Sequence, residues 1–457
     1  MRIIILGAGH VGSSLAKNLQ KQHDITIIDT DPEKLRYIQT HYDVQTVCGI
    51  ASHPDKLEAA NAKDADLLIA VTNNDEVNIV ACQIAYSLFK IPKKIARLRT
   101  KSYTRYAQIF NRDDIPIDFI INPAEFVTQM LVRLIENPGS FQVVDFANNR
   151  LQIAGAQVAE TSNLIGMSLA EFRRELPGVD ARIMGIYRDG NSLDLSDKTR
   201  LAAFDDVFFI TERTNLSIVL AEFCPDQTRF KSIFIAGGGK IGTALAQRLE
   251  KKYTVKLIEK NPDHCHHAAE ILEESIVLSG DAADNELLDP ENIDQADLFC
   301  AVTNDDEANI MSAMLAKRLG AKKTIALINS LSYAELVNET QTIDHGISPH
   351  RITIGVIQTY LRKGEMLNIY SLYGGRCEAM EIVVHGNPQS SPIVGKKIKQ
   401  INLPPSVRIG AIIRNNKVMI AHDEHTIVKK DRIVIVITDL KQTAIIEKLF
   451  QVLPVYL

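Results

Sequence analysis

The chain has 457 residues, which is too long for one ordinary hydrophobic core and predicts two to four domains. Its composition is globular, with 46% apolar and 23% charged residues, and its net charge of −5 excludes a generally basic, nucleic-acid-binding surface. No apolar stretch approaches the ~18–20 residues that span a bilayer, and no signal peptide is expected before the first strand pattern. The six cysteines form no Cys-x-x-Cys pair, which fits a reducing cytoplasm. We expect a soluble, intracellular protein.

The first predicted element is a short apolar strand that leads into a glycine-rich loop. Residues 3–12 read Ile-Ile-Ile-Leu-Gly-Ala-Gly-His-Val-Gly, and the apolar positions that follow recur at helical spacing. Gly7 allows the tight turn from strand to helix, Gly9 lets a pyrophosphate approach the backbone, and Gly12 lets the helix pack closely on the strand. The candidate cofactor loop also contains Ala8, His10 and Val11.

An acidic residue ends the second predicted strand. Asp29 follows the apolar run 25–28 and lies 20 residues after Gly9. This is the spacing at which a dinucleotide-binding fold places a carboxylate on the adenosine ribose. The alternative is an α/β sheet whose glycines serve packing alone. The ligand interpretation is favoured because a strand pattern precedes the loop and a helix pattern follows it.

Two polar residues end the fourth predicted strand, at 67–71. Thr72 and Asn73 lie where doubly wound sheets bind ligands, beyond the carboxyl ends of their strands. They are therefore candidates for ribose and phosphate contacts. An alternative role is to cap the helix that begins near Asp75. The sequence leaves both roles open.

Arg97 ends the next predicted strand, 94–97, which we expect at the edge of the sheet. Its guanidinium could stack on adenine or bind a phosphate. The surrounding basic residues are better explained as a solvated face. Arg97 differs from them because it alternates with apolar neighbours in the strand pattern. Its counterpart in the second half of the chain, described next, is Leu327.

The whole pattern recurs about 230 residues later. Residues 233–242 repeat the apolar run and the glycine loop, and Glu259 follows Gly239 by 20 residues, as Asp29 follows Gly9. Two copies of the motif, each in a strand–helix context, are much stronger evidence than one. The candidate residues of the second site are Gly237, Gly239, Lys240, Ile241, Gly242, Glu259, Thr303 and Asn304.

Each glycine-loop lobe precedes a predicted helix and a smaller β-rich lobe. The helices span residues 123–135 and 349–361 and have proline in the first turn. In the first small lobe, residues 141–158, 182–188 and 207–211 favour strands and residues 168–174 favour a short helix. The second small lobe repeats this pattern at 380–385, 408–414 and 433–438.

The sequence therefore predicts two tandem Rossmann-like, doubly wound α/β domains, each followed by a small α+β domain. The expected boundaries are 1–138 and 139–225 for the first pair, and 230–365 and 366–457 for the second. The break between the halves falls near residues 224–231, where Pro225 interrupts the pattern.

The run His264-Cys265-His266-His267 suggests a metal site, but only His264 and His267 have the spacing that one helix face requires. We favour a helix after Pro262 and assign no metal ligand, although the sequence leaves a site at His264 and His267 open. No Ser-His-Asp series, paired carboxylates or His-Glu-x-x-His motif is visible, so no catalytic residue is assigned.

The duplicated glycine loops, the acid at the second strand, the repeated Ala-Val-Thr-Asn-x-Asp-Glu and the small β-rich lobes resemble the KTN/RCK regulators of potassium transport. The resemblance covers essentially the whole chain. It implies a protein at the inner face of the cell membrane that binds NAD(H) and ATP or ADP. It also implies a homo-oligomer, a tetramer or a dimer, that docks on a separate membrane potassium channel or transporter subunit. Two features depart from a strict repeat: residues 49–51 are Gly-Ile-Ala where 280–282 are Gly-Asp-Ala, and the second half lacks the arginine.

Two other functions remain open. One is an NAD-dependent oxidoreductase with two cofactor sites, although a hydride transferase needs an acid or base facing the nicotinamide and none is visible. The other is a free-standing nucleotide sensor that acts on soluble partners.

Overall fold

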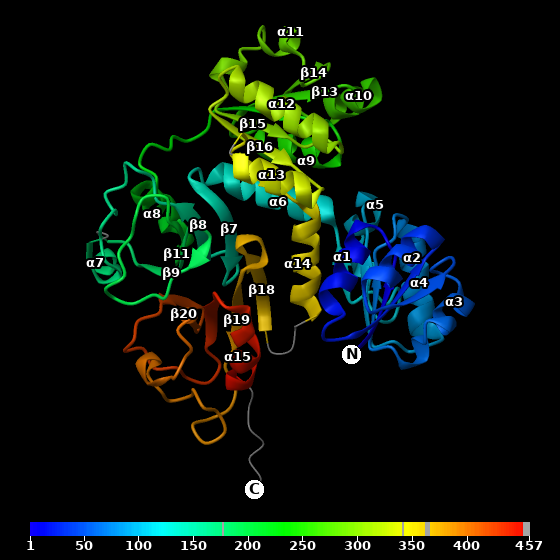
Figure 1. Ribbon diagram of the computed structural model, residues 1–457, viewed down its shortest axis with the longest axis horizontal. Coiled ribbons are helices and arrows are strands. Elements are labelled where there is room, and N and C mark those ends of the chain that lie inside the picture. The colour runs from blue at the N-terminus through cyan, green and yellow to red at the C-terminus, as the bar shows by residue number, and fades with distance from the viewer. Residues whose placement is uncertain (176–177, 341, 362–365, 451–457) are drawn as a thin grey trace. The chain divides into compact units, whose positions relative to one another are not determined.

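The computed structural model describes residues 1–175, 178–340, 342–361 and 366–450. The chain forms two compact units: Met1–Val127 with Ser348–Ile357, and Thr128–Ile347 with Gln358–Leu457. Figure 1 shows their elements and labels most of the helices. Among the described residues, no helix is long and apolar enough to cross a membrane.

The first unit contains a parallel, doubly wound sheet with the strand order β3-β2-β1-β4-β5-β6. The central strands are buried along almost their whole length, as the continuous apolar runs predict. Its elements are β1 (Arg2–Leu6), α1 (His10–Leu19), β2 (Asp24–Asp29), α2 (Pro32–His41), β3 (Gln45–Cys48), α3 (Pro54–Ala59), β4 (Leu67–Ala70), α4 (Asp75–Ser87), β5 (Lys93–Arg97), α5 (Lys101–Arg105) and β6 (Phe119–Ile121).

The expectation that residues 94–97 form an edge strand is wrong. Strand β5 pairs on one side with β4 and on the other with the short strand β6, which forms the edge. Because β6 has only three residues, its apolar pattern is too short to be recognised in the sequence. Arg97 therefore lies at the carboxyl end of an internal strand.

The second unit contains a parallel sheet with the equivalent order, β14-β13-β12-β15-β16-β17. The predicted fold class, with two tandem doubly wound domains, is confirmed. The elements are β12 (Ser232–Ala236), α9 (Lys240–Leu249), β13 (Thr254–Glu259), α10 (Pro262–Ile271), β14 (Ile276–Ser279), α11 (Asn285–Leu288), β15 (Leu298–Ala301), α12 (Asp306–Arg318), β16 (Lys323–Leu327), α13 (Leu331–Thr340) and β17 (His345–Ile347).

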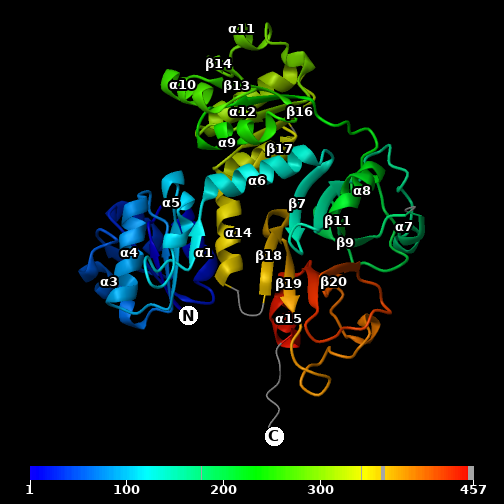
Figure 2. The same cartoon turned by 180° about the vertical axis from the view of Figure 1, so that it is seen from behind.

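The helices that follow the two parallel sheets are exchanged between the halves of the chain. Both predicted helices are present, as α6 (Pro123–Glu136) and α14 (Pro349–Leu361). From Thr128 onward, α6 belongs to the second unit, where it lies beside α9 in both views and Glu136 pairs with Lys252 Nζ at 2.5 Å (Figures 1 and 2). The first ten residues of the segment that contains α14, Ser348–Ile357, belong to the first unit. Residues of each helix thus belong to the same compact unit as the parallel sheet of the other half.

Two antiparallel sheets form the small lobes, with the orders β10-β9-β11-β8-β7 and β18-β19-β22-β20-β21. The stretch 141–158 is a hairpin rather than one strand, because residues 147–149 adopt positive φ and reverse the chain. The elements are β7 (Ser140–Phe146), β8 (Leu151–Gln157), α7 (Leu169–Glu175), β9 (Ala181–Arg188), β10 (Asn191–Ser192), β11 (Asp206–Glu212), α8 (Leu216–Phe223), β18 (Met366–Leu372), β19 (Cys377–Val383), β20 (Val407–Arg414), β21 (Lys417–Ile420), β22 (Arg432–Ile437) and α15 (Thr443–Phe450).

The two small sheets share one hydrophobic core. Phe208 on β11 and Val434 on β22 belong to the same buried cluster, which draws residues from both lobes. Polar contacts around the core are reciprocal: Arg182 donates to the carbonyl oxygen of Ala421, and Arg408 Nη2 donates to that of Leu195 at 2.6 Å. Each of these residues lies 226 positions from its counterpart, so the lobes pair as a two-fold dimer does, within one chain.

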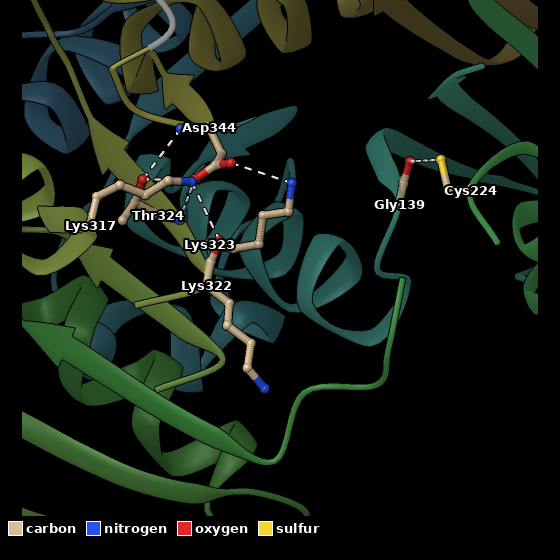
Figure 3. Close-up of polar contacts among 7 residues, drawn as sticks. All are labelled: Gly139, Cys224, Lys317, Lys322, Lys323, Thr324 and Asp344. Carbon is tan, nitrogen blue, oxygen red and sulfur yellow. Dashed lines mark hydrogen bonds and ion pairs between the residues drawn. The ribbon is translucent and has the colours of Figure 1, made fainter. Parts of the chain in front are cut away.

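A charged cluster supports the edge of the second parallel sheet (Figure 3). Asp344 accepts hydrogen bonds from Lys317 Nζ at 2.5 Å and from the Thr324 amide at 2.9 Å, and it lies 3.3 Å from Lys323 Nζ. The neighbouring residue His345 begins β17. Burial lowers the pKa of His345 to about 4, and Lys323 and Lys317 lower it further while Asp344 opposes them.

Figure 3 also shows the contact that closes the first small lobe. Cys224, just after α8, has its Sγ 3.6 Å from the carbonyl oxygen of Gly139 and 3.2 Å from that of Gln157. Burial raises the pKa of the Cys224 thiol, so it remains a protonated, weak hydrogen-bond donor at neutral pH. The end of this lobe is thus held against its beginning.

We predict that His345 makes the protein acid-sensitive. The pKa of about 4 in the folded state lies below the unfolded value near 6.5, so the unfolded chain binds more protons between these limits. The contribution of the neutral His345 ring to the free energy of unfolding is therefore complete above about pH 6.5, and it is lost as the pH falls toward about 4. His345→Phe, which installs the residue found at the equivalent Phe119, should flatten this loss in thermal unfolding. An identical decline in both proteins would contradict the prediction.

Candidate functional site

Each parallel sheet has a candidate ligand site at the carboxyl ends of its two central strands. In the first sheet these strands are β1 and β4: the chain continues from β1 to β2 on one side of the sheet and from β4 to β5 on the other. Ligands bind at such a topological switch point. Gly7 turns the chain here with φ +104°, and a Cβ at this position would lie 3.1 Å from the Thr72 backbone. Gly237 has the same role in the second sheet, with φ +111°. These two turns require glycine.

The third glycine of each loop is required by packing, whereas the second is not. A Cβ on Gly12 would lie 1.8 Å from the carbonyl oxygen of Gly7, and Gly242 meets Gly237 at the same distance. A Cβ on Gly9 or Gly239 meets no atom within 4 Å, and Gly9 has an ordinary φ of −71°. Neither strain nor packing explains Gly9. A glycine at this position leaves the backbone open to the close approach of a ligand.

The loops present the N-termini of α1 and α9 to this space. Gly9 and Gly239 are the N-cap residues, and neither helix has a side-chain cap or an acidic residue in its first turn. The amides of an uncapped first turn need acceptors, and the helix dipole favours an anion. His10 and Lys240, the first residues of the two helices, are exposed and add polar or cationic groups. A phosphate suits this arrangement.

The predicted ribose carboxylates hold the glycine loops in place. Asp29 accepts hydrogen bonds from the Ala8 amide at 2.5 Å and from the Asp31 amide at 2.9 Å. Glu259 accepts in the same way from Gly238 at 2.5 Å and from Asn261 at 2.7 Å. Two such bonds leave a carboxylate with acceptor capacity for ribose hydroxyls. The acids thus join the second strand to the loop and remain able to bind a ligand.

The histidine run near the second site forms the expected helix, α10, after Pro262. His264 lies on its first turn, with Nδ1 3.9 Å from Glu259 Oε2. Across the residues that the structure describes, no three His, Cys, Asp or Glu side chains are grouped to hold a metal ion. His264 therefore lies near the second candidate site, because it is close to Glu259.

Thr72 and Thr303 are held by buried asparagines. Thr72 Oγ1 donates to Asn78 Oδ1 at 2.7 Å, and Thr303 Oγ1 donates to Asn309 Oδ1 at 2.6 Å. The helix caps are Asn74 for α4 and Asp305 for α12, so the capping role considered for Thr72 is wrong. The side chains of Asn73 and Asn304 are exposed at the rim.

Asn78 and Asn309 are positioning residues that the sequence analysis missed. Each is completely buried. Asn78 Nδ2 donates to the carbonyl oxygen of Arg97 at 2.9 Å, and Asn309 Nδ2 donates to that of Leu327 at the same distance. They connect the loop after the fourth strand to the fifth strand. Their recurrence at equivalent buried positions of two helices is the signal that identifies them.

Arg97 is the main asymmetric feature of the first site. Its side chain is only 9% exposed, and its Nη2 donates to the carbonyl oxygen of Thr72 at 2.6 Å. Burial lowers the pKa of Arg97 to about 10, and Arg99 lowers it further while Asp75 opposes this. The group remains charged at neutral pH. Its buried Nε has no hydrogen-bond partner within the described structure, which leaves a donor for a ligand acceptor.

Comparison with known families identifies both kinds of domain. The TrkA-N domain model matches residues 3–123 and 233–349, and the TrkA-C domain model matches residues 153–223 and 387–451. The Trk system potassium uptake protein TrkA of Vibrio alginolyticus is 44% identical over 459 residues, with both chains covered completely. The protein of the same name from Halomonas elongata is 43% identical, with 99% of each chain covered.

Solved structures share the fold at low identity. The GsuK RCK domain matches with a TM-score of 0.63 and 18% identity, covering 98% of this chain and 94% of that one. The GsuK channel bound to NAD matches with the same TM-score and 17% identity, covering 98% and 78%. At this identity the likeness supports the fold alone.

We predict that Gly9 and Gly12 have different roles in the first loop, one in ligand binding and the other in packing. Gly9→Ala should lower the thermal unfolding midpoint only slightly, by no more than the equivalent of the cost of alanine at an N-cap, about 1 kcal/mol, because its Cβ meets no atom. It should weaken calorimetric binding of NADH or ATP at least about tenfold, or ~1.4 kcal/mol. Gly12→Ala should instead destabilise the protein by about 1–3 kcal/mol through overpacking against Gly7. Unchanged nucleotide binding in Gly9→Ala would remove the ligand role of this glycine.

Proposed function

The chain belongs to the TrkA family of Trk-system potassium uptake proteins, and on that premise we propose that it is a nucleotide-binding regulatory subunit of such a system. In this proposal it acts at the cytoplasmic face of the membrane. There it docks on a separate potassium-conducting subunit of the TrkH or TrkG type and changes its opening. The family is one of potassium uptake proteins, not of enzymes.

The observation that carries the proposal is the pair of glycine loops whose backbone can be approached closely from outside the sheet. At Gly9 and Gly239 a Cβ would meet no atom, while Asp29 and Glu259 lie against the same loops. This combination fits a phosphate at the helix N-terminus and a ribose at the carboxylate. We assign NAD(H) and ATP or ADP as the ligands. GsuK, which shares the fold, has been solved with NAD and with ADP.

The two sites differ in charge and are assigned different ligands. Arg97 offers a buried cation to the first site, whereas the equivalent Leu327 is apolar and 1% exposed. Lys240 in the second glycine loop supplies a cation beside the pyrophosphate position, where the first loop has His10. ATP or ADP therefore suits the first site, and the second is dinucleotide-selective or weak.

A homo-oligomer is supported by matching exposed apolar residues on the two parallel-sheet domains. Val80 on α4 and Tyr106 after α5 are 46% and 54% exposed. The equivalent Met311 on α12 and Leu336 on α13 are 60% and 57% exposed. Repetition of the same exposed face allows copies of the chain to associate as a dimer or tetramer. Met311→Glu with Leu336→Glu should reduce the mass measured by light scattering.

Potassium flux through the reconstituted membrane subunit tests the function. Flux should change when this protein is added and should change again with NADH, ATP or ADP, since a ligand acts through unequal affinity for two states. Coupling of about 1–3 kcal/mol corresponds to a 5–150-fold effect. Equal flux in every condition, with nucleotide still bound, would favour the free-standing sensor. Hydride turnover by the isolated protein would favour the oxidoreductase.

We predict that Asp29 selects against a 2′-phosphate. Asp29→Ala should weaken NADH binding at the first site by more than tenfold, because hydrogen bonds to a charged group contribute about 1.5–3 kcal/mol each. It should also narrow the preference for NADH over NADPH. Asp24→Ala, which removes an exposed carboxylate from the start of the same strand, is the matched control. Equal affinity of the unmodified protein for both dinucleotides would contradict the ribose role.

We predict that Arg97→Leu lowers ATP affinity at the first site more than NADH affinity. The variant copies Leu327, which fits the same strand end in the second sheet, so the fold should be retained. Arg105→Leu removes an exposed arginine from α5 and controls for the change in net charge. If calorimetry gives the same ATP affinity for Arg97→Leu as for the unmodified protein, the assignment of Arg97 is wrong.

A further inference from the structure

The first glycine loop contacts a residue from the other half of the chain. The rings of His10 and His350 have their centroids 5.2 Å apart and their planes tilted by 31°. His10 is the first residue of α1, directly after Gly9. His350 is the second residue of α14, after Pro349. The first candidate site is therefore bordered by both halves of the sequence.

His350 lies on the buried face of α14. His350, Thr353 and Ile357 have the spacing i, i+3 and i+7, which places them on one side of a helix. Thr353 is 1% exposed and donates through Oγ1 to the Pro349 carbonyl oxygen at 2.9 Å, and Ile357 is completely buried. Thr353 and Ile357 fix this face of α14 in the interior of the unit. His350, the first residue of the same face, contacts His10. The helix runs beside α1 in both views (Figures 1 and 2).

The charges around this histidine pair favour an anion. Neither α1 nor α14 has an acidic residue in its first turn. Arg97 lies at the same carboxyl edge of the sheet with an unpartnered, buried Nε. The carboxylate of Asp29 is already bound to the amides of Ala8 and Asp31, at the position assigned to the ribose. Imidazole rings can donate to phosphate oxygens in either protonation state.

The second site does not repeat this arrangement. The residue 226 positions before His350 is Ala124, and the residue 230 positions after His10 is Lys240. An alanine side chain can neither donate nor accept a hydrogen bond. A histidine pair at the rim of a glycine loop is therefore a property of the first site alone among the two copies.

We propose that His10 and His350 together bind a phosphate of the nucleotide in the first site. Occupancy of that site is thereby transmitted to α14, which passes from the first unit into the second at Gln358. The inference rests on the proposed nucleotide-binding function and deepens it. It assigns His350 as a contact residue for the phosphate chain, selective for ligands that carry a pyrophosphate or triphosphate. Because the site contains residues from both halves of the chain, a bound nucleotide can shift the conformations of both halves.

Calorimetric titration of the full-length protein with ATP, ADP and adenosine tests the contact. His350→Gln should weaken ATP and ADP binding by about threefold to tenfold, the effect of losing one hydrogen bond of ordinary net strength. Adenosine binding should stay unchanged. His10→Gln should act similarly, and the double variant should lose less than the product of the two effects, because both rings hold one phosphate. His266→Gln, on exposed α10, is the matched control.

Hydrogen exchange tests the transmission. ATP should protect the amides of residues 353–357 in the unmodified protein and in His266→Gln, but not in His350→Gln. If His350→Gln binds ATP, ADP and adenosine as the unmodified protein does, the proposed contact is wrong while the nucleotide function stands. If the unmodified protein binds no nucleotide, the proposed function itself fails. Loss of adenosine and ATP affinity in equal measure would assign His350 a structural role and overturn the inference.

Discussion

The close approach of Gly12 to Gly7 is the contact on which each Rossmann-like domain depends. A Cβ on Gly12 would lie 1.8 Å from the Gly7 carbonyl oxygen, so residue 12 must be glycine, and the φ of +104° at Gly7 requires glycine there as well. This approach brings the first turn of α1 to the end of β1. It also brings the Ala8 amide within 2.5 Å of Asp29. The positions of the uncapped helix N-terminus and of the Asp29 carboxylate thus follow from one packing contact.

Duplication has made the small lobes partners within one chain. Each five-stranded sheet has two apolar faces: one packs within its own lobe, and the other is covered by the sheet of the opposite lobe. The reciprocal donation from Arg182 and Arg408 to carbonyl oxygens of the opposite lobe gives the pairing a defined register. Burial of large side chains such as Phe208 contributes about 1.5–3 kcal/mol each, so the two halves are held together by a core and not only by a linker.

The two copies keep one fold while their electrostatics differ. Lys94 is buried and bonded to Asp118 in the first sheet, whereas Thr324 and two neighbouring lysines support Asp344 in the second. The two sheets also differ in charge at their carboxyl edges, where Arg97 in the first sheet corresponds to the apolar Leu327 in the second. Substitutions that do not alter the backbone thus give the two candidate sites of one duplicated scaffold different charges.

The sequence by itself determined the local features: which segments form strands and helices, where the chain turns, and which acid lies beside each loop. These depend on periodicity and on the glycine spacing, both of which are properties of short segments. Only the tertiary structure decided that β5 is internal, that Thr72 bonds to Asn78 and that α6 and α14 are exchanged. A sequence pattern shows that a face is buried but does not identify its partner, because contacts between distant segments are selected by the packing of the whole chain.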